Sequence, residues 1–254
     1  MVHLLPLPGS PSYRGSMAEV VDTAVSDAGL LVQSGFPSLL IENFGDSPFY
    51  PGSVPAETVA AMSVAVEAVI SEWDAVVGIN VLRNDARSAL AVAAATGAAF
   101  IRVNVLAGTM FTDQGPIVGE AAEVLRSRRA LCPSVEIWAD VMVKHATPPP
   151  GSDPALLAGD ILERSGADAV IVSGSGTGAK PDLETAGMIR EAIGREARLV
   201  IGSGATVENL AELAGVADTV IVGSSLKHDG EAANQVDPER ALAFVEAART
   251  VGLL

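Results

Sequence analysis

The chain of 254 residues has few of several residue types, and each shortage excludes something. Cys132 is its only cysteine, so no disulfide can form within the chain, which fits a reducing compartment. No uninterrupted apolar run reaches the roughly 18 residues of a membrane-spanning helix. The N-terminus lacks a basic region and meets Pro6 and Pro8 at once, unlike a secretory signal peptide. We therefore expect a cytoplasmic protein without a membrane span.

Basic residues are also scarce. The chain has 16 Lys and Arg against 31 Asp and Glu, a formal net charge of −15. No basic patch is visible that could offset repulsion from phosphate backbones, so nucleic acids and anionic membranes are not expected partners. The only lysines are Lys144, Lys180 and Lys227. Each follows an apolar run or lies in a Gly-rich loop, which makes each a site candidate; Lys227 could face a bound phosphate or lie in solvent at a helix end.

Several catalytic motifs are missing. The sequence has no H-E-x-x-H, no Walker motif, no cysteine cluster and no G-x-S-x-G elbow. Nucleotide hydrolysis by a P-loop is therefore the least favoured of the functions considered. Aromatic residues make up only 4% of the chain, whereas 49% of residues are hydrophobic. Small aliphatic side chains in such numbers favour a large core of interdigitating strands and helices.

Short β-branched runs alternate with longer helical patterns along the whole chain. Because buried parallel strands are continuous apolar runs, this alternation predicts a parallel sheet with crossover helices. The predicted strands are Val2–Leu5, Ser38–Glu42, Ala75–Val81, Phe100–Val105, Val135–Val141, Ala169–Val172, Leu199–Ile201 and Thr219–Val222. The predicted helices are Met17–Ser34, one starting near Pro55, Asp85–Thr96, Gly119–Ala130, one starting at Asp153-Pro154, one from Asp182 to before Gly194, a short one before Thr219, and one from Asp237-Pro238 to about Val251; Gly108–Pro116 is predicted as a polar loop.

Eight strand–helix units in about 250 residues predict a single domain, residues 1–254, folded as a (β/α)8 TIM barrel with parallel strands. A doubly wound open sheet is the competing architecture. It is disfavoured because no G-x-G-x-x-G stands between the first strand and the first helix. Eight regular units also suit closure of the sheet.

Polar residues interrupt the apolar runs near the predicted strand ends, where barrel enzymes carry their catalytic groups. The candidates are His3, Glu42, Asn80, Arg102, Asn104, Asp140, Lys144 and His145. Glu42 or Asp140 could act as a base, and a buried Lys144 with Arg102 could stabilise an oxyanion. The structural alternatives are an internal Glu42–Arg102 ion pair and a packed His3. No cofactor is specified, and a divalent metal held by Glu42 and Asp140 is a weaker alternative.

Glycine-rich turns follow the last three predicted strands. Glycine at a strand end lets the backbone approach a ligand, and the last two strands of such barrels often form a phosphate site. The predicted phosphate-binding residues are Gly202, Ser203, Gly204, Gly223, Ser224 and Ser225, with Gly174, Gly176 and Thr177 as a further wall. The alternative is that these are ordinary tight turns.

Long blocks of the sequence resemble the BtpA/SgcQ family. They are H-L-L-P-L-P-G-S-P (3–11), I-E-N-F-G-D-S-P-F (41–49), G-I-N-V-L-R-N-D-A (78–86), F-I-R-V-N-V-L-A-G (100–108), T-D-Q-G (112–115) and A-D-V-M-V-K-H-A (139–146). The resemblance covers nearly the whole chain and is looser around Pro148–Pro150. It implies a TIM barrel of the phosphate-binding type. Some relatives are tied to photosystem I accumulation, and others to sugar uptake and metabolism.

Two functions follow from these features. The first is an enzyme that binds a small phosphorylated metabolite and carries out isomerase, epimerase or aldolase-like chemistry. The second is a non-enzymatic factor for the assembly or stability of a protein complex, as in photosystem I biogenesis. The clustered polar strand ends favour the enzyme. Self-association into a homo-oligomer is expected because such barrels often associate.

Overall fold

Eight short strands form one parallel sheet, and their spatial order is their order along the chain. The computed structural model describes residues 1–174 and 182–254. The strands are β1 (Val2–His3), β2 (Ser38–Glu42), β3 (Val76–Asn80), β4 (Phe100–Val103), β7 (Glu136–Met142), β9 (Ala169–Val172), β10 (Arg198–Ile201) and β11 (Thr219–Val220). The parallel order and the intervening helices confirm the predicted α/β architecture.

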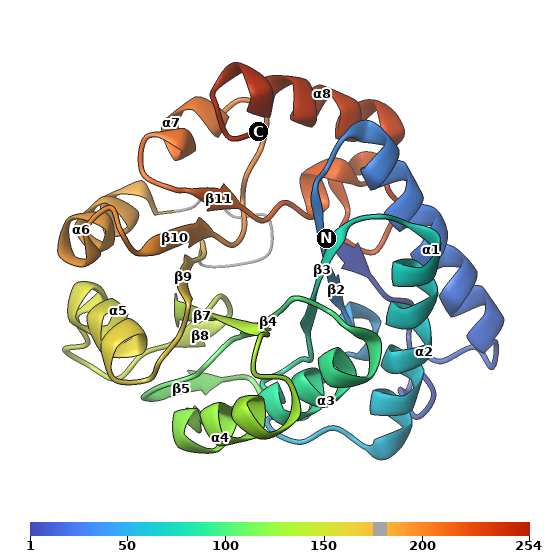
Figure 1. Ribbon diagram of the computed structural model, residues 1–254, viewed down its shortest axis with the longest axis horizontal. Coiled ribbons are helices and arrows are strands. Elements are labelled where there is room, and N and C mark those ends of the chain that lie inside the picture. Colours follow the sequence, from blue (N-terminus) through green and yellow to red (C-terminus); the bar gives the residue numbers. More distant parts are fainter. Residues whose placement is uncertain (175–181) are drawn as a thin grey trace.

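The sheet curls so that its first and last strands meet. The amino group of Met1 donates a hydrogen bond to the carbonyl oxygen of Val222, at 2.9 Å, across 221 positions of sequence. Figure 1 shows the strands around a central axis with the helices outside them. The fold is therefore a (β/α)8 barrel, as predicted, and not an open doubly wound sheet.

The helices surround the strands, and several of them begin at a side-chain N-cap. The helices are α1 (Met17–Ser34), α2 (Ala56–Glu72), α3 (Ala86–Thr96), α4 (Ala121–Leu131), α5 (Pro154–Glu163), α6 (Leu183–Ile193), α7 (Leu210–Ala214) and α8 (Pro238–Thr250). At α3, α5, α6 and α8 an aspartate carboxylate accepts hydrogen bonds from N–H groups of the first turn. These N–H groups have no carbonyl partner within the helix, so the carboxylate takes its place. In the part of the chain that the structure describes, each helix is too short or too polar to cross a membrane.

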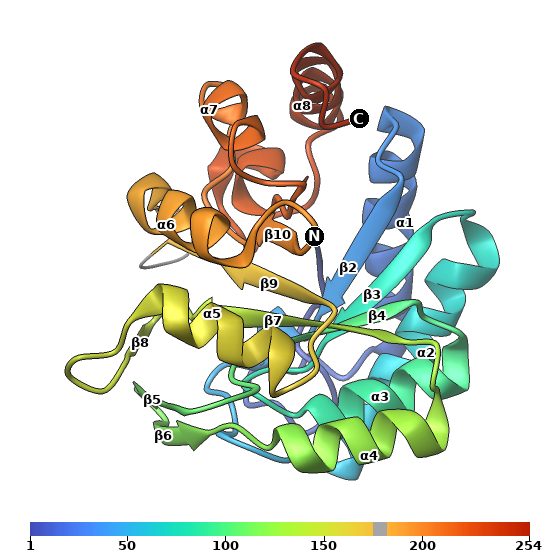
Figure 2. The same ribbon diagram turned by 60° about the vertical axis from the view of Figure 1, so that its left-hand side comes forward.

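One predicted loop is instead a hairpin. Residues 108–116 were expected as a polar loop, but β5 (Thr109–Thr112) and β6 (Gly115–Val118) pair antiparallel, and β8 (Ala146–Thr147) joins them. Burial explains the difference, because Met110 and Ile117 pack on Val105 and Val143 as a small core of their own. In Figure 2 this small sheet lies beside α5, outside the main strands.

The barrel interior has two layers, which follow from the alternation of side chains along each strand. Near the strand starts, an apolar layer combines Leu40, Phe100, Trp138, Ala169, Ile171, Val200 and Ile221. Two residues further along β2, β4 and β7 the same interior face carries Glu42, Arg102 and Asp140, each buried. A charged layer thus lies on an apolar one, at the carboxyl ends of the strands.

Gly78 on β3 makes room in the apolar layer for the neighbouring Phe100 ring. A Cβ atom built at Gly78 would lie 2.2 Å from two atoms of that ring. Because overpacking a core displaces side chains from their preferred rotamers, we predict that Gly78→Ala lowers the free energy of unfolding by about 1–3 kcal/mol. Urea denaturation measures this change.

The matched control is Gly159→Ala in α5, where a Cβ meets no atom within 4 Å. Alanine is favoured over glycine inside a helix, so this variant should be more stable by about 0.5–1 kcal/mol. A Gly78→Ala protein as stable as the wild type would contradict the tight packing of Phe100.

Candidate functional site

Arg102 on β4 and Asp140 on β7 form a buried bidentate ion pair at the centre of the charged layer. The Arg102 Nε and Nη2 atoms donate to the two Asp140 carboxylate oxygens at 2.9 and 2.8 Å. Ser173 also donates to Asp140, at 2.9 Å, and accepts from Arg102 Nη2 at 3.2 Å. Although burial opposes its charge, the Asp140 carboxylate raises the pKa of the Arg102 guanidinium. Arg102 thus pairs with Asp140, and the expected internal pair with Glu42 is wrong.

Two asparagines brace this pair from neighbouring strand ends. The Asn80 amide donates to the Arg102 carbonyl at 3.1 Å and to the Asn104 side-chain oxygen at 3.0 Å. Asn104 in turn donates to Asp140 at 3.5 Å. Both asparagines are buried. Their contacts hold the backbone and side chains of the ion pair in place. The two asparagines therefore position the ion pair.

Glu42 lies at the end of β2 in the same layer, and its surroundings are unusual. Its side chain is 1% exposed, and neither carboxylate oxygen has a hydrogen-bond partner among the described residues. The nearest charged or chargeable atom recorded is His3 Nε2, at 4.0 Å. A buried carboxylate normally has hydrogen-bond partners, since desolvation without them is expensive. Glu42 is therefore a buried carboxylate whose two oxygens accept no hydrogen bond within the described chain.

His3 lies beside Glu42 at the end of β1. Its ring stacks on Phe44 with centroids 4.4 Å apart, and its Nδ1 is 2.8 Å from the carbonyl oxygen of Ala232. Burial lowers the pKa of the imidazole to about 4, while the Glu42 carboxylate acts in the opposite direction. His3 is therefore neutral at pH 7, donating Nδ1–H to the carbonyl and leaving Nε2 as an acceptor toward the site.

Because His3 is buried in its neutral form, the free energy of unfolding depends on pH. The unfolded chain keeps a histidine pKa near 6.5, whereas the folded value is about 4, so the unfolded state takes up the proton first as the pH falls. The stabilisation is complete above pH 6.5 and declines toward pH 4, by up to about 3 kcal/mol. We predict that His3→Gln reduces this decline in urea denaturation at pH 7 and pH 4.5.

The control is His228→Gln, because the His228 side chain is 54% exposed. That variant should lose as much stability on acidification as the wild type does. Equal acid sensitivity of the wild type and His3→Gln would show that His3 is not held neutral by burial.

Lys144 follows β7 and adds a cation to the same region. Burial lowers the pKa of its ammonium, and Arg102 and Arg83 lower it further, while Glu42 and Asp140 raise it. Among the described residues its Nζ has no hydrogen bond or ion pair. Its backbone carbonyl accepts a hydrogen bond from Arg83 Nη2 at 2.6 Å. His145 is exposed and has a left-handed backbone, with φ 55°.

Arg83 is a site residue that the candidate list omitted. It is 4% exposed, its Nε has no partner among the described residues, and burial lowers the pKa of its guanidinium. Asp113 of the β5–β6 hairpin, Asp140 and Glu42 all act on its charge. Two signals pointed to it, its place among the polar residues that follow the third predicted strand and its place in the G-I-N-V-L-R-N-D-A block.

The glycine-rich turns after β10 and β11 lie next to each other and next to this cluster. Ser225 Oγ donates to the Ala205 carbonyl at 2.8 Å, which joins the two turns. A Cβ on Gly202 would lie 3.2 Å from Arg102 Nη2, and one on Gly223 would lie 3.6 Å from His3 Cε1. No hydrogen bond is found within the described chain from the backbone N–H groups of Ser203, Gly204 and Gly223. The turns therefore offer free donors beside the charged layer.

The remaining predicted residues fall in three places. Ser224 and Ser225 lie in a short 3-10 helix, Ser224–Leu226, after β11. Gly174 donates its N–H to Ser203 Oγ at 3.0 Å, which links the turn after β9 to the turn after β10. Gly176 and Thr177 lie outside the described residues. Within the described ranges, no three His, Cys, Asp or Glu side chains gather as a metal-ligand set.

Lys227 does not belong to the site. Its Nζ forms a buried ion pair with Asp27 of α1, at 2.6 Å, and the other Asp27 oxygen accepts from the Val236 N–H. Both side chains are at most 3% exposed. Both expectations for Lys227, facing a phosphate or lying in solvent, are therefore wrong. The pair instead fastens the segment after β11 to α1.

Comparison with known proteins places the chain in a family. The model of the BtpA family matches residues 1–250. The chain is 45% identical over 247 residues to the photosystem I biogenesis protein BtpA of Synechocystis, covering 97% of this chain and 86% of that one. It is 42% identical over 251 residues to an uncharacterized protein of Pyrococcus abyssi, covering 99% and 95%.

Solved structures with low identity share the fold. 3-Hexulose-6-phosphate synthase from Salmonella typhimurium matches with a TM-score of 0.59 and 18% identity, over 91% of this chain and 94% of that chain. Phosphoribosyl anthranilate isomerase from Thermus thermophilus matches with a TM-score of 0.57 and 13% identity, over 89% and 94%. At such identities the likeness establishes the barrel and leaves the chemistry to the residues of the site.

Proposed function

The chain belongs to the BtpA family, and from the layout of its barrel we propose that it is an enzyme acting on a small phosphorylated metabolite. The proposed reaction begins with proton transfer at a carbon or oxygen of the substrate, as in isomerases, epimerases and aldolases. The observation that carries the proposal is Glu42, a buried carboxylate with no hydrogen-bond partner in the described chain. The following points support it.

Glu42 is suited to be the general base. A base must reach the substrate proton, and a carboxylate already engaged by donors would be a weaker acceptor. The two carboxylates of the charged layer differ in this respect. Asp140 accepts from Arg102 and Ser173, whereas Glu42 makes no such bond with the described residues. Asp140 is therefore proposed to hold Arg102 in place, and Glu42 to react.

Cations around Glu42 fit an anionic substrate. Arg102 is matched by Asp140, which leaves Arg83 and Lys144 as positive groups that act on Glu42. A protein of net charge −15 thus keeps cations at the carboxyl ends of its strands. In a partly buried place, such cations attract an anion and stabilise an oxyanion or enolate as it develops. Lys144 is the proposed electrophilic partner of Glu42.

The joined turns after β10 and β11 are the proposed phosphate site. The free N–H groups of Ser203, Gly204 and Gly223 supply donors without side chains in the way. Their place after the last two strands matches the phosphate position of many barrels of this fold. A sugar phosphate bound there would extend from Gly202 and Gly223 toward Arg102, His3 and Glu42.

A paired ligand screen tests the proposal. Sugar phosphates and the same sugars without phosphate are compared by their effect on thermal unfolding. A phosphorylated ligand present at 100 times its Kd should stabilise the folded chain by about 2.7 kcal/mol, and its unphosphorylated counterpart by much less. Equal effects of the two members of every pair would contradict a phosphate-binding enzyme.

A charge variant then locates the phosphate. Ser224→Asp places a carboxylate at the turn after β11, where it would repel a phosphate. We predict that the affinity for the sugar phosphate, obtained from its effect on thermal unfolding, falls at least tenfold. Ser152→Asp, on an exposed loop, is the matched control and should bind as the wild type does. Unchanged binding by Ser224→Asp would place the phosphate elsewhere.

The name of the Synechocystis relative favours a second candidate, a factor for assembly of a protein complex. Relatives at 42% identity in Pyrococcus abyssi and 32% in the animal Caenorhabditis elegans argue for a function not tied to photosynthesis. An assembly factor needs the surface of the barrel and not the reactivity of Glu42. If the wild type and Glu42→Gln rescue a gene-deletion strain equally well, this second candidate would be favoured.

A further inference from the structure

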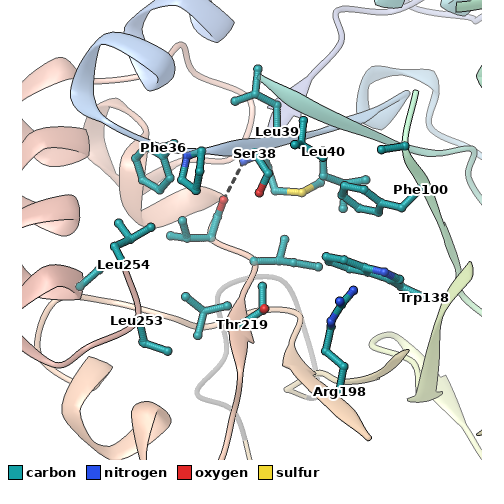
Figure 3. A pocket seen from close by; sticks show the side chains of 18 of the residues that line it. Phe36, Ser38, Leu39, Leu40, Phe100, Trp138, Arg198, Thr219, Leu253 and Leu254 are labelled. Carbon is teal, nitrogen blue, oxygen red and sulfur yellow. Dashed lines mark hydrogen bonds between the residues drawn. The ribbon is translucent and has the colours of Figure 1, made fainter. Parts of the chain in front are cut away.

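A pocket of about 510 Å³ lies at the opposite end of the barrel from the charged layer. Its wall includes the first residues of several strands, among them Ser38, Phe100, Glu136, Arg198 and Thr219. In Figure 3, Phe100 and Trp138 lie on one side of it, and Leu253 and Leu254 on the other. We call it the floor pocket. Its volume is within the range of small-molecule sites, roughly 300–1,000 Å³.

The wall of the floor pocket is mostly apolar. Leu40 and Ile221 come from the apolar interior layer, Phe36 from the turn before β2, and Leu253 and Leu254 from the segment after α8. Leu254 is 47% exposed, so part of this wall meets solvent. An apolar cavity holds water poorly and takes up apolar molecules instead. The wall of the floor pocket therefore favours binding of a hydrocarbon group.

The aromatic rings in the wall have their faces covered. Phe100 and Trp138 stack on each other with centroids 4.1 Å apart, and the Arg198 guanidinium carbon lies 5.5 Å from the centre of the Trp138 ring. The Phe100 ring also packs against Gly78. Phe36 and Phe244, which also line the pocket, stack on each other with centroids 6.0 Å apart. A flat aromatic ligand would therefore compete with existing stacked partners for the ring faces. A flexible alkyl chain, which needs only contact with ring edges and aliphatic groups, fits this wall better.

The charges at the floor pocket are matched within the chain. Arg198 Nη1 pairs with Glu136 Oε2 at 2.5 Å, and the same oxygen accepts from Trp138 Nε1 at 2.8 Å. The Met1 amino group donates to Val222, and burial lowers its pKa to about 5, so it is neutral at pH 7. The Arg198 and Glu136 side chains are each 41% exposed, so the pair lies at the rim of the pocket, and a carboxylate ligand would have to displace Glu136 from Arg198.

We propose that the floor pocket is a second binding site, for a neutral molecule with an alkyl chain. The chain would lie between Leu40, Ile221 and Leu254, with a neutral polar end near the hydroxyl of Thr219 or Ser38 at the start of the strands. This site is independent of the chemistry at Glu42, because the apolar interior layer separates the two ends of the barrel.

A series of alcohols tests the proposal through Trp138. The variant Trp73→Phe leaves Trp138 as the only tryptophan. Titration with 1-butanol, 1-hexanol and 1-octanol should change its emission saturably, with Kd falling about fourfold for each added methylene. Octanoate should bind at least tenfold more weakly than 1-octanol. Thermal unfolding of the wild type in the same alcohols gives the same ranking without the Trp73 substitution.

A filling variant keeps the test specific. Thr219→Phe occupies the floor pocket and should weaken 1-octanol binding at least tenfold, whereas Met188→Phe, on the exposed side of α6, should leave it unchanged. Affinity that does not rise with chain length would overturn the proposal. So would octanoate binding as tightly as 1-octanol, or unchanged binding by Thr219→Phe.

Discussion

Replacing Arg102 by methionine should lower the free energy of unfolding by about 3–5 kcal/mol. Arg102 and Asp140 are both at most 2% exposed, and their bidentate bond supplies two of the four hydrogen bonds that the Asp140 carboxylate accepts among the described residues. Methionine keeps much of the volume and removes the charge, so Asp140 remains buried with Ser173 and a distant Asn104 as its donors. Urea denaturation, followed by circular dichroism, measures the loss.

The double variant Arg102→Met/Asp140→Leu is the control for this prediction. Removing both charges avoids a buried unpaired carboxylate, so the double variant should recover most of the stability lost by the single one. A single variant that loses less than about 1 kcal/mol would show that water reaches Asp140. The ion pair thus has a structural role in the site, and the proposed reactive group, Glu42, lies beside it.

Replacing Glu42 by glutamine should have the largest effect on activity and little effect on stability. Glutamine has the same shape but accepts no proton, so a reaction that depends on Glu42 as general base should slow by about 10²–10⁴-fold. The stability of the variant should equal or exceed that of the wild type, because a buried carboxylate without a hydrogen-bond partner in the described chain is replaced by a neutral group. A loss of activity at full stability separates a catalytic role from a structural one.

Hydrogen exchange into the substrate measures this effect before the full reaction is known. Sugar phosphates that stabilise the protein are incubated with it in D2O, and loss of the carbon-bound hydrogen beside the carbonyl is followed by NMR. The exposed Glu72→Gln on α2 is the matched control and should exchange at the wild-type rate. Exchange by Glu42→Gln at the wild-type rate would assign the base to another residue.

Segments with strong local signals were predicted with correct bounds. The amphipathic segment Met17–Ser34 and the apolar run Ser38–Glu42 have the predicted bounds, since a serine cap, a left-handed Gly35 and continuous burial mark their ends. The strands near Phe100 and Thr219 are shorter than predicted, ending at Val103 and Val220 instead of Val105 and Val222. Apolar patterns continue past the point where backbone pairing stops.

Contacts between distant strands could not be predicted from the sequence. Arg102 had two carboxylates available by position, and the pairing of β4 with β7 decides that Asp140, 38 residues away, faces it. Lys227 pairs with Asp27, 200 residues away, because closure of the barrel brings the segment after β11 to α1. The β5–β6 hairpin was missed because its strands are only four residues long and each buries a single large apolar side chain, Met110 or Ile117. The choice of partner within a buried layer is a property of the closed sheet.

A crystal structure with a sugar phosphate from the thermal screen is the most direct test of the proposed site. We predict the phosphate at the N–H groups of Ser203, Gly204 and Gly223, and the sugar within hydrogen-bond distance of Glu42 and Lys144. A saturating ligand whose phosphate lies away from these turns, or whose sugar lies out of reach of Glu42, would contradict it.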